Sequence, residues 1–113
     1  MTISDRRFSN RYRLKVPLVF CATSSLLAKG HLEKSTNISL RGVYFMTGEP
    51  VSVGLSVQVL LRMPKRLSGK QAIHRVFTGR VSHIESQDSQ NGILGVGVEF
   101  FYWEIPLEVN LTR

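Results

Sequence analysis

Arginines are concentrated near the amino terminus of the chain. Arg6, Arg7, Arg11 and Arg13 place four guanidinium groups within eight residues, and Arg7 and Arg11 are four residues apart. This spacing puts Arg7 and Arg11 on one side of either an extended segment or a helical turn. A guanidinium binds phosphate through two parallel hydrogen bonds, pairs with O6 and N7 of guanine, and stacks on an aromatic base. The segment therefore suits an anionic purine nucleotide, although a solvated basic tail would have the same composition.

A second group of polar residues lies at 35–45, between two apolar stretches. Asn37 and Ser39 are two residues apart, so on an extended chain their side chains point the same way. Asn37 can both donate and accept hydrogen bonds, and Ser39 offers a hydroxyl. Gly42 allows either a positive φ or a close backbone approach. The segment fits a ligand-binding hairpin, and also an ordinary polar turn with a glycine hinge.

The sequence lacks the motifs of common catalytic and metal sites. His31, His74 and His83 are scattered, and together with the one cysteine they show no zinc-site spacing. There is no Walker loop, no Gly-x-Gly-x-x-Gly turn and no Gly-x-Ser-x-Gly elbow, and the few acidic residues do not pair as acid and base. We therefore expect no enzymatic activity, no metal and no cofactor.

The charge of the chain favours anionic partners. Among 113 residues, 15 Lys and Arg outnumber 8 Asp and Glu, for a net charge of +7. Such an excess suits nucleic acid, nucleotides, phosphorylated ligands or acidic lipid, or serves solubility alone. The apolar runs are too short to cross a membrane, and Val16–Ala22 lacks an export-signal cleavage pattern. The lone Cys21 predicts a small buried side chain in a reducing compartment, so we expect a cytoplasmic protein without membrane insertion.

Most of the chain alternates apolar and polar residues in steps of two, the period of a β-strand. Pro17 cannot donate to a ladder, so the first strand should run along an edge or begin near it; Gly79 should mark a bulge. Only the tail has helical spacing, with Trp103, Leu107 and Leu111 every four residues. The pattern predicts an antiparallel barrel or sandwich, with strands over 14–20, 31–38, 43–47, 57–61, 72–85 and 93–101.

In this order, the two polar segments resemble the PilZ domain family, whose pattern is Arg-x-x-x-Arg followed by Asp/Asn-x-Ser-x-x-Gly. Residues 7–11 and 37–42 fill both motifs without a mismatch, and 79–81 and 95–100 look like the family's last two barrel strands. The resemblance spans residues 6–101. It implies a six-stranded antiparallel β-barrel, here with a short C-terminal helix. Residues 1–13 would form the basic ligand-binding segment and 14–113 the barrel domain.

The resemblance also implies a ligand, the bacterial second messenger cyclic di-GMP. Asn37 stands where Asp is commoner in the family, so this position keeps a hydrogen-bond acceptor but loses the negative charge. Carried over by position, the contacts come from Arg6, Arg7 and Arg11 on phosphates and guanine edges, from Asn37 and Ser39 on a guanine edge, from Gly42 in the turn, and from His83 on the fifth strand.

Three functions follow from these observations. The first is a non-catalytic cyclic di-GMP receptor that signals to an unidentified partner protein, with residues 1–11 becoming ordered when the nucleotide binds. The second is a basic β-barrel that binds nucleic acid, against which we note that aromatics interleaved with Lys and Arg are sparse. The third is a nucleotide-blind interaction protein, against which the intact arginines count. The first function accounts for both polar segments and is therefore preferred.

Overall fold

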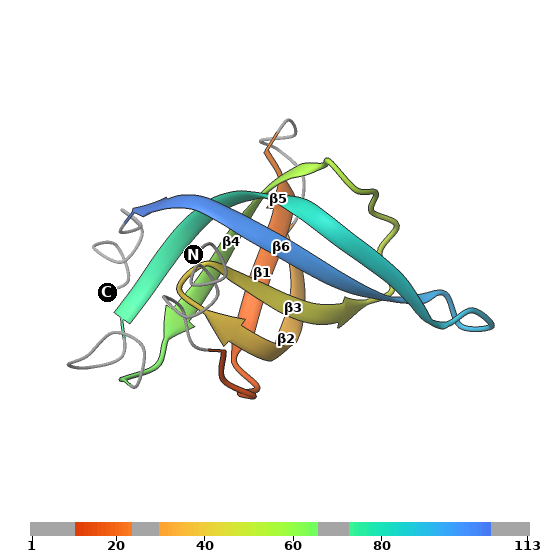
Figure 1. Cartoon of the computed structure of the whole chain (residues 1–113), viewed down its shortest axis with the longest axis horizontal. Helices are drawn as coiled ribbons and strands as arrows, with labels where there is room; N and C mark the ends of the chain where they lie inside the picture. Colours follow the sequence, from red (N-terminus) through yellow and green to blue (C-terminus); the bar gives the residue numbers. More distant parts are fainter. Residues whose placement is uncertain (1–10, 24–29, 66–72, 105–113) are drawn as a thin grey trace, which may run out of the picture.

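Six antiparallel strands form one closed barrel in the computed structural model, which describes residues 11–23, 30–65 and 73–104 (Figure 1). Around the barrel the order is β1-β2-β3-β6-β5-β4, and β1 closes the sheet by pairing with β4. The predicted six-stranded antiparallel β-barrel is confirmed. The strands are β1 (Pro17–Ala22), β2 (His31–Ser39), β3 (Gly42–Thr47), β4 (Ser56–Met63), β5 (Ile73–Asp88) and β6 (Ile93–Glu104).

The barrel interior is filled by the apolar residues that alternate along the strands, as a small closed barrel requires. Cys21 follows the inward-facing Phe20, so it points outward and is only partly buried, which corrects the prediction of a buried cysteine. The buried apolar side chains are Leu18, Phe20, Ile38, Val43, Phe45, Val57, Val59, Leu61, Met63, Phe77, Val81, Val96 and Val98.

Three local features test the sequence predictions. The first strand begins at Pro17, and the β5–β6 register shifts between Thr78 and Gly79, so both predictions are confirmed. Trp103, however, lies in β6 opposite Phe77, and the helical interpretation of that residue is wrong. Pairing with the long strand β5 overrides a local four-residue spacing. The rest of the predicted helix, with Leu107 and Leu111, lies outside the described residues.

β5 and β6 are the longest strands, and Figure 1 shows the turn that joins them projecting beyond the other strands. Gly92 has a φ of 68° in this turn, a conformation that favours glycine. In the ranges that the structure describes, no helix could span a lipid bilayer.

Candidate functional site

The end of the arginine segment lies against the β2–β3 hairpin. Tyr12 and Ile38 form an antiparallel bridge, in which each backbone N–H donates to the other's carbonyl oxygen at 2.9 Å. This bridge places Arg11 beside Asn37, and Nη1 of Arg11 donates to Oδ1 of Asn37 at 3.2 Å. Two motifs whose residues are 26 positions apart therefore meet on the surface of the barrel. Arg6 and Arg7 lie outside the described residues.

Ser35 fixes the course of the chain between this contact and β1. Its side chain is 2% exposed, and its hydroxyl donates to the Leu14 carbonyl at 2.5 Å and accepts from the Val16 N–H at 2.8 Å. The Ser35 N–H donates to the Val16 carbonyl at 2.9 Å. The sequence analysis missed this role. A hydroxyl at a position where alternation calls for an apolar side chain is the signal that could have indicated it, because buried hydroxyls need partners.

Ser39 and Gly42 build the turn of the hairpin. Ser39 is 4% exposed, and its Oγ accepts from the Arg41 N–H at 3.1 Å. It lies opposite Gly42 in the ladder. A Cβ on Gly42 would overlap the carbonyl oxygen of Val98, so of the two roles expected for this glycine, the structure shows the close backbone approach. Asn37, opposite Tyr44, remains the side chain of the motif that extends toward solvent.

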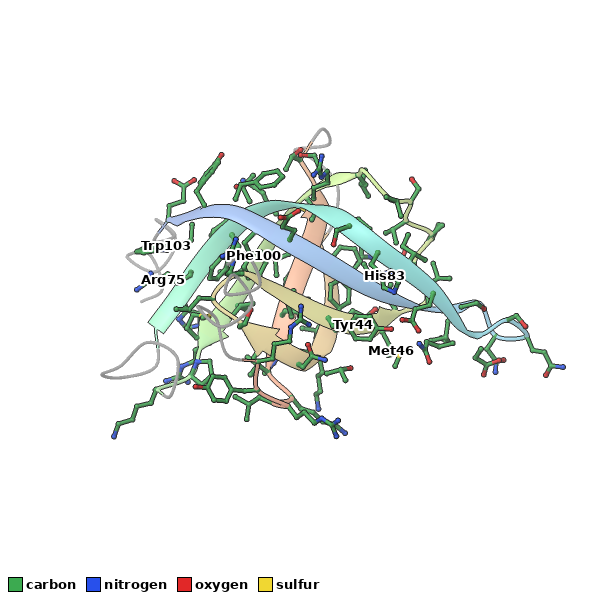
Figure 2. The ribbon with its side chains drawn as sticks, viewed as in Figure 1. Tyr44, Met46, Arg75, His83, Phe100 and Trp103 are labelled. Carbon is green, nitrogen blue, oxygen red and sulfur yellow. The ribbon has the colours of Figure 1, made fainter. Side chains whose placement is uncertain are left out.

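A row of cross-strand partners leads from Asn37 over the outer face of the barrel to His83. Asn37 pairs with Tyr44, Tyr44 with Gly97, and Gly97 with His83. Figure 2 shows Tyr44 and His83 on either side of β6. Three strand spacings, about 14 Å, separate Asn37 from His83. The structure thus brings Arg11 and Asn37 together and places His83 at the far end of the same row.

The side chains around His83 form a hydrogen-bonded chain above β6. His83 Nε2 lies 2.9 Å from Oε2 of Glu85, and Gln87 Nε2 donates to Oε1 of Glu85 and to the Tyr44 hydroxyl, both at 3.1 Å. A Cβ on Gly95 would overlap the Tyr44 hydroxyl. The missing side chain therefore makes room for the Tyr44 ring, and the network gives that ring a fixed position.

Four further cations lie on the two segments that meet at the Arg11–Asn37 contact, the stretch before β1 and the β2–β3 hairpin. Arg13, Lys15, Lys34 and Arg41 are all exposed. The acid nearest to Gly42 in the ladder, Glu99, lies 3.8 Å from the Arg80 guanidinium. The positive charges on this side therefore attract an anion.

An open hollow adjoins the contact through Thr36. Two of its lining residues are lysines, one is a glutamate and three are apolar, so it could receive the less polar part of an anionic ligand. No group of three or more His, Cys, Asp or Glu within 11–23, 30–65 and 73–104 could hold a metal ion. The lining residues of the hollow are Lys15, Pro17, Leu32, Glu33, Lys34, Ser35, Thr36 and Met46.

Comparison with known proteins identifies the fold. No protein-family model matches the chain, and no curated protein matches it. Among solved structures, the Bacillus subtilis inhibitor of motility (MotI/DgrA) matches with a TM-score of 0.65 and 16% sequence identity. The two chains share a fold. The match covers 91% of this chain and 45% of that one, so this chain spans under half the length of the motility inhibitor. The likeness supports the PilZ-like barrel that the two motifs implied.

Proposed function

We propose that this chain is a non-catalytic, cytoplasmic receptor for cyclic di-GMP. The observation that carries the proposal is the hydrogen bond from Arg11 to Asn37, because it joins the end of Arg-x-x-x-Arg to the start of Asn-x-Ser-x-x-Gly. A guanidinium fork and an amide on one exposed surface suit a phosphate beside a guanine edge. The surrounding cations and the PilZ-like barrel support the same ligand.

The proposed roles follow from where the side chains lie. Arg11, together with Arg6 and Arg7, binds phosphates and the O6 and N7 edge of guanine, while Asn37 exchanges its bond to Arg11 for one to a guanine edge. Ser39, whose hydroxyl accepts a hydrogen bond from the backbone N–H of Arg41, shapes the hairpin under the ligand. His83 meets only a ligand, or a part of one, that extends over Tyr44 and Gly97.

The proposed output is a contact with a partner protein. Binding of the nucleotide neutralises the mutual repulsion of the clustered arginines, so that residues 1–10, ahead of the Arg11–Asn37 contact, become ordered over it. The closed segment presents a surface that the partner recognises. Ordering uses part of the gross binding energy.

Calorimetric titration tests the proposal, with cyclic di-GMP and a single-stranded oligonucleotide compared at two salt concentrations. Saturable binding of the dinucleotide with modest salt sensitivity supports the receptor. A steep salt slope with the oligonucleotide would instead indicate a nucleic-acid-binding barrel. No measurable binding of either ligand would indicate an interaction protein that does not recognise nucleotides.

A further inference from the structure

Within the described residues, one edge of β6 has no neighbouring strand near its carboxyl end. Pairing of β6 with β3 ends at Glu99, which lies opposite Gly42, and the Phe100 N–H then donates to the Arg41 carbonyl at 2.8 Å. Beyond that bond, Phe101 lies at the register shift between Thr78 and Gly79, and Tyr102, Trp103 and Glu104 pair with β5 on one side only, as far as the described ranges extend. An edge of this kind presents backbone N–H and C=O groups to which another strand can add.

Three consecutive aromatic side chains occupy this edge and are exposed. Phe101 is 56% exposed, Tyr102 57% and Trp103 49%. The preceding Phe100 packs inward on Phe77, with their ring centroids 4.0 Å apart, so the edge rests on the core. Isolated exposed apolar residues are ordinary on a protein surface, but a contiguous aromatic run marks an interaction site.

Arginines accompany the aromatic rings. The Arg75 guanidinium carbon lies 3.4 Å from the centre of the Trp103 ring, and that of Arg80 lies 5.5 Å from the centre of the Phe101 ring. Figure 2 shows Arg75, Trp103 and Phe100 gathered at one end of the barrel. Cations outnumber acids around these rings: Arg41 lies beside the edge and Arg75 and Arg80 lie on the paired strand β5, against Glu99 and Glu104 on β6.

The other open edge of the same hairpin differs in character. From Ser82 onward, no described strand covers β5 on the side away from β6. That stretch carries the exposed polar side chains of His83, Glu85 and Gln87, and charged and polar side chains are a usual protection of strand edges. The aromatic edge of β6 lacks such protection among its first three residues.

We propose that Phe101–Glu104 binds an extended segment of a partner protein in which acidic and apolar residues alternate. The segment adds one antiparallel or parallel strand to β6 through backbone hydrogen bonds. Its apolar side chains pack on the exposed aromatic rings, and its carboxylates face the surrounding arginines. The site is distinct from the Arg11–Asn37 contact and does not require a bound nucleotide, so it goes beyond the function proposed above.

Trp103 is the only tryptophan of the chain, so its fluorescence reports directly on this edge. The probe is a blocked synthetic peptide of about eight residues, long enough for one strand, that alternates Glu and Val. We expect a saturable blue shift of the Trp103 emission as the ring becomes buried. The same peptide with alternate backbone nitrogens methylated cannot complete a ladder and should bind at least about tenfold more weakly. A Lys-Val peptide should not bind.

Substitutions at the edge provide the second arm of the test. Tyr102→Ser should weaken peptide binding about tenfold, because exposed aromatics dominate such contacts, and Arg80→Gln should weaken it and reduce its salt dependence. Val53→Ser is the matched control, since Val53 is a 63% exposed apolar residue between β3 and β4, away from both proposed sites; it should leave peptide binding unchanged. Circular dichroism checks that each variant is folded.

Three results would overturn the proposal. The first is no change of Trp103 emission with the Glu-Val peptide, including the case in which the emission is already that of a buried ring. The second is equal binding of the methylated peptide. The third is binding of single-stranded oligothymidine, with a steep salt slope, in preference to the peptide, which would assign the aromatic edge to nucleic acid. Calorimetry with cyclic di-GMP, run separately, tests the nucleotide site, so failure of one proposal does not imply failure of the other.

Discussion

The guanidinium of Arg11 and the amide oxygen of Asn37 hydrogen-bond each other at 3.2 Å. Both groups are therefore already in place before a ligand arrives, and each serves as a substitute partner for the other. A nucleotide that binds here has to replace this bond with better ones. Because the contact is solvent-exposed, the replacement costs little, and the phosphate and guanine groups provide charge-assisted bonds in return.

Arg11→Ala should lower the affinity for cyclic di-GMP about tenfold to a hundredfold. A hydrogen bond to a charged group contributes roughly 1.5–3 kcal/mol, and the exposed side chain of Arg11 takes no part in the core. The stability of the barrel should therefore stay the same. Calorimetry measures the affinity, with Arg62→Ala on β4 as the control that removes the same charge elsewhere. Arg7→Ala should have an effect of the same size, and near-normal binding by the double variant Arg7→Ala/Arg11→Ala would contradict the nucleotide site.

Asn37→Asp should change the affinity for cyclic di-GMP by no more than about 1 kcal/mol in either direction. The new carboxylate strengthens bonds to guanine N–H groups, but it also strengthens the competing contact with Arg11 and repels the ligand phosphates. Titration of the variant beside the native chain measures the balance. Loss of measurable binding would show that Asn37 serves the ligand mainly as a donor.

Ser35→Ala should destabilise the barrel by about 1–3 kcal/mol, because it leaves the Leu14 carbonyl and the Val16 N–H without their hydroxyl partner. Chemical denaturation measures the loss. Amide exchange at Val16 should accelerate, and nucleotide binding should weaken because this stretch positions Arg11. Thr36→Ala, at an exposed neighbouring position, is the control for the denaturation and exchange measurements. Unchanged exchange at Val16 would argue against Ser35 as the anchor.

Gly42→Ala should destabilise the barrel by about 1–3 kcal/mol or more, since a methyl group there meets the Val98 carbonyl oxygen. Gly97→Ala is the matched comparison, because Gly97 lies on the neighbouring strand β6, two positions before Glu99, the partner of Gly42. A Cβ on Gly97 has no contact closer than 3.4 Å, to the Cβ of His83, so this variant should change the free energy of unfolding by less than about 1 kcal/mol. Urea unfolding of both variants decides the matter, and equal stability of the two would contradict the close approach at Gly42.

The turn between β5 and β6 should respond weakly to acid. The side-chain amide of Asn91 donates to Asp88 at 2.7 Å and holds the pKa of Asp88 below its ordinary value, helped by the backbone N–H of Asn91. A carboxylate with a lowered pKa stabilises the folded turn above its unfolded pKa, and this contribution is lost as the pH falls through the folded pKa. Asn91→Ala should raise the pKa of Asp88 toward its ordinary value, as measured by an NMR titration of the carboxyl carbon. An unchanged titration would exclude Asn91 as the main cause.

The strands could be predicted because a barrel with a filled interior imposes strict alternation on its walls. Val57, Val59 and Leu61 alternate in the sequence and are buried in the structure. Alternation does not show where a strand stops, so β6 was predicted to end too early and the aromatic edge at Trp103 was interpreted as the start of a helix. The end of β6 depends on the length of its partner β5, which is information from another part of the chain.

The candidate site could be predicted in its residue types but not in its internal contacts. The two-residue spacing predicted that Asn37 and Ser39 point the same way and both contact the ligand. In the structure Asn37 lies at the surface, whereas the Ser39 hydroxyl is used inside the turn. The role of Ser35 depends on a backbone segment that reaches it from 21 residues away. Such contacts follow from the closed barrel and from no local pattern.

The position of β6 between β3 and β5 has a consequence for synthesis of the protein. A ribosome makes β3 well before β6 and β5 just before it, so for a time the growing chain holds β3 without the neighbour that joins it to β5. Until β6 is in place, the barrel is not closed and its core side chains are exposed to solvent. The hairpin that carries Asn37 and Gly42 also lacks the strand against which it packs. The hairpin that meets Arg11 therefore gains its full packing only when β6 is in place.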